Sequence, residues 1–235
     1  TGTGEAIGFT DDLYLNSGAE VVSSAAELFD VAELIIKVKE PQASEVELLT
    51  SKHTLFTYLH LAPDHDLTDS LIASGATCIA YETVTDEQGR LPLLAPMSEI
   101  AGRMAVQAGA HSLEMAAGGR GVLLSGAAGV PAAEVIILGG GVVGSNALAV
   151  AVGMGARVTV LDTSMNRLRE LDSHYGNRIN TVYSTRTALD EHLARADLVV
   201  GAVLLPGASA PKLIKHSHLH SMKLGSVIVD VAIDQ

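Results

Sequence analysis

The chain has 235 residues, a formal net charge of −12 and 48% hydrophobic residues, which is enough for one large or two modest domains with a buried core. The acidic balance, with no Lys/Arg cluster, argues against a nucleic-acid surface, and no apolar run reaches the roughly 18 residues of a membrane span. The single cysteine, Cys78, excludes an internal disulfide and is expected to be a buried structural thiol. A cytoplasmic location is the default expectation.

Residues 1–94 predict strands that alternate with helices, a pattern typical of a parallel sheet. The expected strands are Leu34–Val38, His53–Leu59 and Thr77–Tyr81. The expected helices are Asp11–Ser17, Ser24–Phe29, Ser44–Thr50 (capped near Ser44) and Asp66–Ser74 (closed by Gly75). Leu91–Met97 carries two prolines and is interpreted as a crossover to a second unit.

Residues 95–235 predict a second α/β unit. It opens with a long helix, Met97–Met115, whose many small residues favour tight packing. The expected strands are Val135–Leu138, Arg157–Leu161, Asn180–Tyr183, Asp197–Val203 and Ser226–Val231. Helices are expected near Met165–Ser173 and Thr187–Arg195, and a loop over Leu204–Ala210. This rhythm is that of a doubly wound nucleotide domain.

The predicted fold class is therefore α/β, with two doubly wound, Rossmann-like parallel-sheet domains. The chain begins Thr-Gly-Thr-Gly without an initiator Met, and it ends directly after a strand-like run. We therefore expect a fragment of a longer protein. On this interpretation the first domain, residues 1–94, is incomplete and the second, residues 95–235, is truncated at its C-terminus.

A glycine turn follows the first strand of the second unit. Gly139, Gly141 and Gly144 match the pattern G-x-G-x-x-G. The first glycine permits the tight turn, the second lets the backbone approach a pyrophosphate, and the third lets the helix pack against the strand. The helix N-terminus offers free N–H groups to the phosphates. Asp162 ends the next strand about 20 residues on, where an acid accepts from a ribose hydroxyl.

This combination predicts a dinucleotide site, and the acid favours NAD over NADP because a 2′-phosphate would meet its charge. Arg167 lies nearby and weakens that preference. The alternative interpretation is an α/β turn that binds no nucleotide.

Three ionisable residues follow apolar strand-like runs: Lys39, His60 and Asp234. The carboxyl ends of strands line the ligand crevice of open α/β sheets. A histidine there can shuttle a proton near neutral pH, and a lysine can hold a carboxylate. Each alone is more simply a surface residue, but their common placement favours a site. The alternating His216, His218 and His220 are interpreted as a solvated loop, and no metal site is predicted, because no Cys or acid completes the set.

The motifs resemble those of the alanine dehydrogenase family over essentially the whole chain. The matching stretches are KVKEP (37–41), FTYLHLA (56–62), AYETV (80–84), LPLLAPMSEIAGRMA (91–105), ILGGGVVGSNA (137–147), GAVLLPGASAPKL (201–213) and VIVDVAIDQ (227–235). The related transhydrogenase α-subunit has the same general architecture but differs at YLHLA and AIDQ.

The resemblance implies roles for single positions. Lys39 matches a lysine at the substrate carboxylate, and His60 and Asp234 match the catalytic histidine and aspartate. The implied cofactor residues are Ser98, Gly139, Gly141, Val142, Val143, Gly144, Asp162, Arg167, Ser184 and Val203. Family members also carry a PKE segment with a substrate-binding arginine before this region and an ANMP stretch after it, so we expect these 235 residues alone to be poorly active.

The implied activity is NAD-dependent oxidative deamination of L-alanine to pyruvate and ammonia, reversible, in a cytoplasmic homohexamer. Two alternatives stay open. One is a transhydrogenase or saccharopine-type relative with another substrate. The other is a non-catalytic NAD(H)-binding module.

Overall fold

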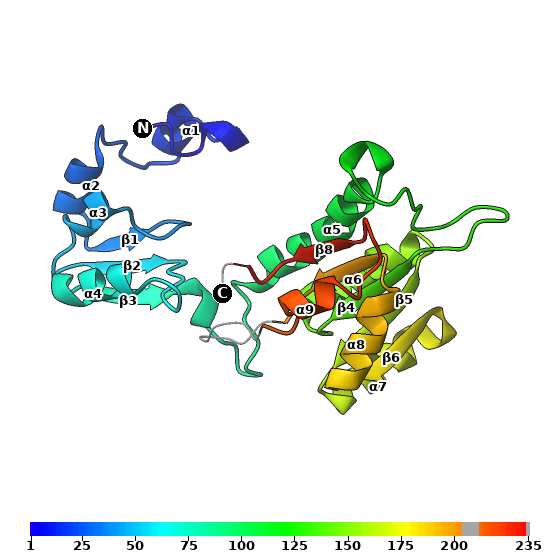
Figure 1. Cartoon of the computed structure of the whole chain (residues 1–235). Coiled ribbons are helices and arrows are strands. Elements are labelled where there is room, and N and C mark those ends of the chain that lie inside the picture. Colours follow the sequence, from blue (N-terminus) through cyan, green and yellow to red (C-terminus); the bar gives the residue numbers. More distant parts are fainter. Residues whose placement is uncertain (204–211, 234–235) are drawn as a thin grey trace. The chain divides into compact units, whose positions relative to one another are not determined.

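The computed structural model describes residues 1–203 and 212–233, which divide into two compact units, Thr1–Val84 and Thr85–Gln235 (Figure 1). This boundary precedes the one predicted at residue 94. Residues 86–94 include several that line a cavity together with residues of the second unit. No helix among the described residues is long and apolar enough to cross a membrane.

The first unit contains a three-stranded parallel sheet in the order β1-β2-β3. Its strands are β1 (Leu34–Ile36), β2 (Thr54–Thr57) and β3 (Thr77–Ala80). Its helices are α1 (Asp11–Asn16), α2 (Ala25–Val31), α3 (Ala43–Val46) and α4 (His65–Ser74), with short 3₁₀ turns at Glu5–Ile7 and Tyr81–Thr83. The predicted alternation is present, although each strand is shorter than expected.

Helix α3 differs most from its prediction. It is capped by Gln42 rather than Ser44 and ends at Val46. The Glu45 carboxylate accepts from the Gln42 N–H at 2.7 Å and pairs with the Lys37 ammonium. The Glu45 carboxylate thus binds both the Gln42 N–H and the Lys37 ammonium. The helix therefore begins at Ala43, before the cap predicted near Ser44.

The two faces of this sheet are covered differently. Ile35 and Leu55 are buried against Phe29 of α2 and Leu71 of α4. Cys78, in register with Leu55, is half-buried rather than fully buried, and its burial raises the pKa of its thiol. The opposite face presents Ile36 and Ile79, which are 64% and 42% exposed. Within the described residues, one face of the sheet is therefore apolar and open to solvent.

The second unit contains a five-stranded parallel sheet in the order β6-β5-β4-β7-β8. Its strands are β4 (Glu134–Leu138), β5 (Arg157–Asp162), β6 (Ile179–Tyr183), β7 (Leu198–Gly201) and β8 (Val227–Asp230). Its helices are α5 (Ala95–Ser112), α6 (Val142–Gly153), α7 (Met165–Tyr175), α8 (Arg186–Arg195) and α9 (His216–Leu219), with 3₁₀ turns at Met115–Ala117 and Gly176–Arg178.

This strand order confirms the predicted Rossmann-like architecture. The chain builds outward from β4 to β6 and then returns to the other side of β4 with β7. The direction therefore reverses between β4 and β7, and in such sheets the ligand crevice lies at the carboxyl ends of the strands at that point. The predicted loop 204–210 lies outside the described residues.

The central strand β4 is buried on both faces. Val135 and Ile137 pack into a cluster with residues of α5, α6 and α7, whereas Ile136 and Leu138 pack with Leu189 and Leu193 of α8. A continuous apolar run is what a parallel sheet covered on both sides requires. Helix α8 therefore covers one face of β4, and α5 and α6 cover the other.

Helices α5 and α6 approach each other at the backbone. A Cβ at Gly102 would lie 2.2 Å from the Val143 carbonyl oxygen, and one at Gly109 would lie 2.5 Å from the Leu198 side chain. The small residues along α5 therefore have a packing role. They let this helix lie directly on α6 and β7.

We expect Gly102→Ala to destabilise the protein by about 1–3 kcal/mol, because the new methyl must displace backbone rather than a flexible side chain. Gly153→Ala is the matched control, since a Cβ there meets nothing within 4 Å. Thermal and urea unfolding would measure both variants. Equal stabilities for the two would contradict the packing argument.

Candidate functional site

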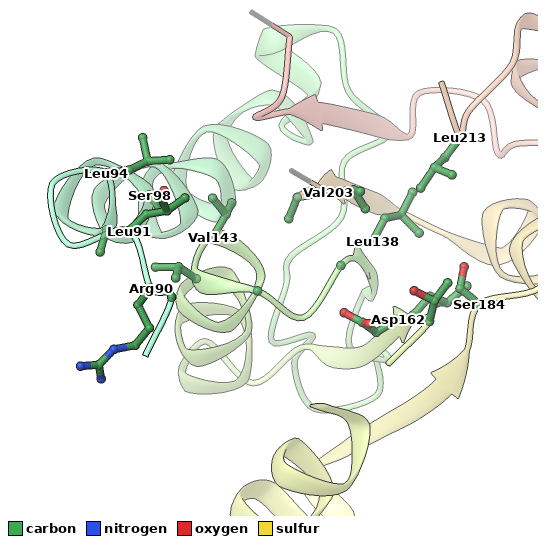
Figure 2. Close-up of a pocket in the computed structure, with 18 of the residues that line it drawn as sticks. Arg90, Leu91, Leu94, Ser98, Leu138, Val143, Asp162, Ser184, Val203 and Leu213 are labelled. Atoms are coloured by element: carbon green, nitrogen blue, oxygen red, sulfur yellow. The ribbon is translucent and has the colours of Figure 1, made fainter. Parts of the chain in front are cut away.

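A cavity of about 790 Å³ lies in the second unit at the carboxyl ends of β4 and β5 (Figure 2). Eight of the residues predicted to bind a cofactor line it: Ser98, Gly139, Gly141, Val142, Val143, Asp162, Ser184 and Val203. These residues come from α5, the glycine turn, the first turn of α6, and the ends of β5, β6 and β7. The fold thus gathers at one crevice positions that are up to about a hundred residues apart in the sequence. A smaller cavity, of about 250 Å³, shares Leu138, Val203 and Leu213 with it and extends along β8.

The three motif glycines differ in their surroundings. Gly139 has a φ of +95°, and a Cβ there would lie 2.9 Å from the Ala202 carbonyl oxygen. A Cβ at Gly144 would lie 1.8 Å from the Gly139 carbonyl oxygen, so α6 packs directly on the turn. Gly141 caps α6, and a Cβ there meets nothing within 4 Å. Only Gly141 therefore faces open space.

The Asp162 carboxylate is tied to the turn. One oxygen accepts from the Gly140 N–H at 2.6 Å, and the other accepts from the Ser164 N–H at 2.7 Å. Arg167, by contrast, is not among the cavity-lining residues. Its Nε donates to the Gly140 carbonyl at 2.6 Å, and its Nη1 donates to Glu170 at 2.7 Å. Arg167 braces the turn from the side of α7, while Asp162 contributes to the cavity wall.

One wall was not predicted. The segment before α5 and the first residue of that helix line the cavity: Asp86, Gly89, Arg90, Leu91, Pro92, Leu94 and Ala95. The last four fall in Leu91–Met97, which was interpreted from its prolines only as a crossover. In Figure 2, Leu91 and Leu94 lie beside Ser98 and Val143. The Arg90 guanidinium extends away from the glycine turn and bonds Asp86 at 2.7 Å. The two prolines were the available signal, but sequence alone does not tell which surface a crossover covers.

These residues fit a dinucleotide. An open glycine at the N-terminus of α6 leaves room for a phosphate against free N–H groups. A carboxylate stands at the end of β5, and apolar side chains such as Leu138 and Val143 line the remaining wall. Small-molecule sites combine a mostly apolar lining with a few placed polar groups in this way.

In the first unit, Lys39 and His60 follow neighbouring strands. Each lies three residues beyond the last residue of its strand, β1 for Lys39 and β2 for His60. The Thr57 hydroxyl donates to the Lys39 carbonyl at 2.7 Å, which joins the two strand ends. The Lys39 side chain is exposed and has no partner within the described residues, whereas the nearby Lys37 is paired with Glu45. Lys39 is the lysine available to an anion.

His60 has a strained backbone. Its φ of 49° is the only positive value of a non-glycine residue in the described part of the chain, and this conformation costs on the order of 1–2 kcal/mol in an L-residue. Its imidazole is half-buried and stacks on Tyr58, with ring centroids 6.1 Å apart at an interplanar angle of 15°. Burial, together with the Glu82 and Tyr81 side chains, raises the pKa of the Tyr58 hydroxyl.

Glu82 also belongs to this group, although it was not predicted as a site residue. It follows β3, as Lys39 and His60 follow β1 and β2, so the same strand-end argument could have found it in AYETV. Its carboxylate accepts from the backbone N–H groups of His60, at 2.7 Å, and Leu59, at 3.1 Å.

Two other predictions concern the C-terminal part of the chain. Asp234 lies outside the described residues. The segment with His216, His218 and His220 was predicted as a solvated loop but contains the short helix α9, where the half-buried His218 lies 3.1 Å from the Asp190 carboxylate. No group of three or more His, Cys, Asp or Glu side chains in residues 1–203 and 212–233 is placed to hold a metal ion.

A parallel sheet that reverses its strand order beside a glycine turn and a strand-end acid defines the class of dinucleotide-binding α/β proteins. The family model described as "Alanine dehydrogenase/PNT, C-terminal domain" matches residues 105–235, and the corresponding N-terminal domain model matches residues 1–101. The chain belongs to the alanine dehydrogenase/PNT family.

Individual relatives agree with this assignment. The alanine dehydrogenase of Halomonas elongata is 60% identical over 99% of this chain, and that of Methanococcus maripaludis is 55% identical over all of it. An L-alanine dehydrogenase structure superimposes with a TM-score of 0.88 at 49% identity, covering 100% of this chain and 65% of the other. A transhydrogenase structure from Sinorhizobium meliloti gives a TM-score of 0.79 at 29% identity, covering 99% and 68%. The chain spans 62% of the length of the two curated relatives.

We expect Gly141→Ala to fold normally but to lose NADH affinity by at least about tenfold, because its methyl enters only the space proposed for the pyrophosphate. Gly144→Ala should lower both the NADH affinity and the melting temperature, because its methyl collides with the Gly139 carbonyl. NADH fluorescence titration and thermal unfolding of both variants would measure this. Unchanged NADH affinity in Gly141→Ala would show that the cofactor does not approach the turn there.

Proposed function

We propose that the protein carrying this chain is an NAD-dependent alanine dehydrogenase, which converts L-alanine to pyruvate and ammonia and can run in reverse. The observation that carries the proposal is the cavity at the glycine turn, with Asp162 at the end of β5. The names of the relatives at 55–60% identity support the choice of alanine as substrate.

The cofactor residues have distinct proposed tasks. The amides around Gly141 at the start of α6 bind the pyrophosphate, and the Asp162 carboxylate accepts from the ribose hydroxyls of the adenosine half. A carboxylate at this position repels a 2′-phosphate, which favours NAD over NADP. Ser98, Ser184 and Val203 contribute further cavity contacts, and Arg167 holds the turn in shape.

The substrate residues belong to the strand ends of the first unit and to the C-terminal stretch. Lys39 Nζ binds the substrate carboxylate, which fixes the position of Cα. The bound nicotinamide supplies the hydride acceptor. The His60 imidazole takes and returns protons as water adds to the substrate iminium carbon and ammonia leaves. Asp234 assists by orienting the reacting groups.

The family also includes transhydrogenases, so a different substrate is the second candidate. The transhydrogenase structure is less similar, at 29% identity. A non-catalytic NAD(H)-binding role is the third candidate. Because the chain spans 62% of the length of its relatives, the candidates are best tested in the complete protein. The hexamer and the cytoplasmic location implied by the resemblance stay predictions.

The decisive experiment is an assay of the complete protein that contains these residues. We expect alanine-dependent NADH formation, and at least about a hundredfold preference in kcat/KM for NAD over NADP, since one charge repulsion in a partly enclosed site is worth a few kcal/mol. Glycine, serine, glutamate and saccharopine would be compared as substrates. NADH binding without turnover of any amino acid would favour the non-catalytic role.

We expect His60→Ala to lower kcat by at least about a thousandfold, because general acid–base catalysis by a placed side chain typically contributes 10²- to 10⁴-fold. NADH affinity should stay within about twofold of the wild type, since the cofactor residues belong to the second unit. Stopped-flow turnover and NADH fluorescence would measure the two quantities. A loss of NADH binding instead would assign His60 a structural role. His65→Ala, at the exposed start of α4, is the matched control.

A further inference from the structure

We propose that Glu82 is a positioning residue for His60. Its carboxylate fixes the strained backbone turn from which the imidazole projects, and it does so without contacting the imidazole ring itself. This inference rests on the proposed function, because it gives Glu82 a task in the proton transfer assigned to His60.

The first observation is the strain at His60. A φ of 49° is costly for a residue with a Cβ, so such a conformation persists only where the surroundings impose it. The surroundings here are hydrogen bonds from two neighbouring amides to one carboxylate. Glu82 Oε1 accepts from the His60 N–H at 2.7 Å and from the Leu59 N–H at 3.1 Å, and Oε2 also accepts from the Leu59 N–H, at 3.3 Å. An ionised acceptor makes such bonds roughly twice as strong as neutral ones.

The second observation is that the same short turn also fixes the ring stack. Glu82 lies in the 3₁₀ turn Tyr81–Thr83 directly after β3. The Tyr81 ring meets the Tyr58 ring edge-on at 4.9 Å, and the Tyr58 ring lies parallel to the imidazole of His60. One residue of the turn therefore holds the backbone of His60, and its neighbour supports the aromatic ring beside the imidazole.

The third observation separates positioning from proton relay. Within the part of the chain that the structure describes, the hydrogen bonds of the half-buried Glu82 carboxylate go to the backbone amides of Leu59 and His60. A carboxylate that tuned the imidazole would accept from a ring nitrogen. If the position of the Glu82 acceptor oxygen is what matters, a neutral oxygen in the same place should still hold the His60 backbone. A charged oxygen that lies further away should not.

Two variants of the complete protein test this contrast. Glu82→Gln keeps an acceptor oxygen at the same distance from the main chain, so its kcat should stay within about threefold of the wild type. Glu82→Asp keeps the charge but withdraws the oxygen by about one carbon–carbon bond. Its kcat should fall roughly ten- to hundredfold, the size of effect expected when a reacting group is displaced by about 1 Å. Affinity for NADH should be unchanged in both.

The control is Thr83→Ala, which removes the bond from the Thr83 hydroxyl to the Ala80 carbonyl in the same turn. Its kcat should match the wild type. In parallel, the imidazole resonances of His60, assigned by their absence in His60→Ala, should move in Glu82→Asp and not in Glu82→Gln. This NMR measurement does not depend on turnover.

The outcomes are distinct. Wild-type protein without alanine-dependent turnover would overturn the proposed function, while the NMR comparison would still decide the positioning role. Active wild-type protein with an active Asp variant and an inactive Gln variant would show that Glu82 acts by its charge, and the positioning inference would be wrong. Equal kcat in all three variants would also overturn it.

Discussion

The packing of the second unit depends on close backbone contacts at two glycines, where no side chain would fit. Gly144 of α6 rests on the carbonyl of Gly139, and Gly102 of α5 rests on the carbonyl of Val143, the second residue of α6. Helix α6 is therefore fixed to the glycine turn at its start and to α5 along its side. Because α5 carries Ser98 and α6 begins at the turn, these two close contacts set the width of the cofactor cavity.

The first unit also contains parallel strands, and functional side chains follow their ends. Three parallel strands end at one edge, and each is followed by a residue with a functional group: Lys39, His60 and Glu82. The strand ends are joined by bonds between Thr57 and the Lys39 carbonyl and between Glu82 and the His60 amide. A lysine free to bind an anion and a histidine held in a strained turn are thereby kept on one small sheet.

Much of this could be predicted from the sequence, because the signals were local or periodic. The apolar run of β4, the glycines of the turn and Asp162 each carry their own pattern, and the α/β class follows from the alternation of strands and helices. The cavity wall formed by residues between Asp86 and Ala95 could not be predicted in this way. Which surface a crossover covers depends on packing between elements distant in sequence, and nothing in the two prolines encodes it.

Other differences have equally physical causes. Ser44 was expected to cap α3, but the N-cap is Gln42. The Glu45 carboxylate, within the helix, accepts from the Gln42 backbone N–H. Cys78 was expected to be buried, but it lies at the edge strand β3 of a small sheet and remains half-exposed. The position of Glu82 after β3 follows the same strand-end pattern as Lys39 and His60, but its bonds go to main-chain amides, and such contacts leave no residue-type pattern in the partner segment.

The contact between Gly102 and Val143 also bears on how mutational data for this family should be interpreted. In a screen of single substitutions scored by activity, positions 102 and 144 should both tolerate nothing larger than glycine. Neither residue lines the cavity. Gly141 should be equally intolerant for a chemical reason. Intolerance alone would group all three as ligand contacts, and only a parallel measurement of protein abundance would separate the residues that shape the site from the one that meets the cofactor.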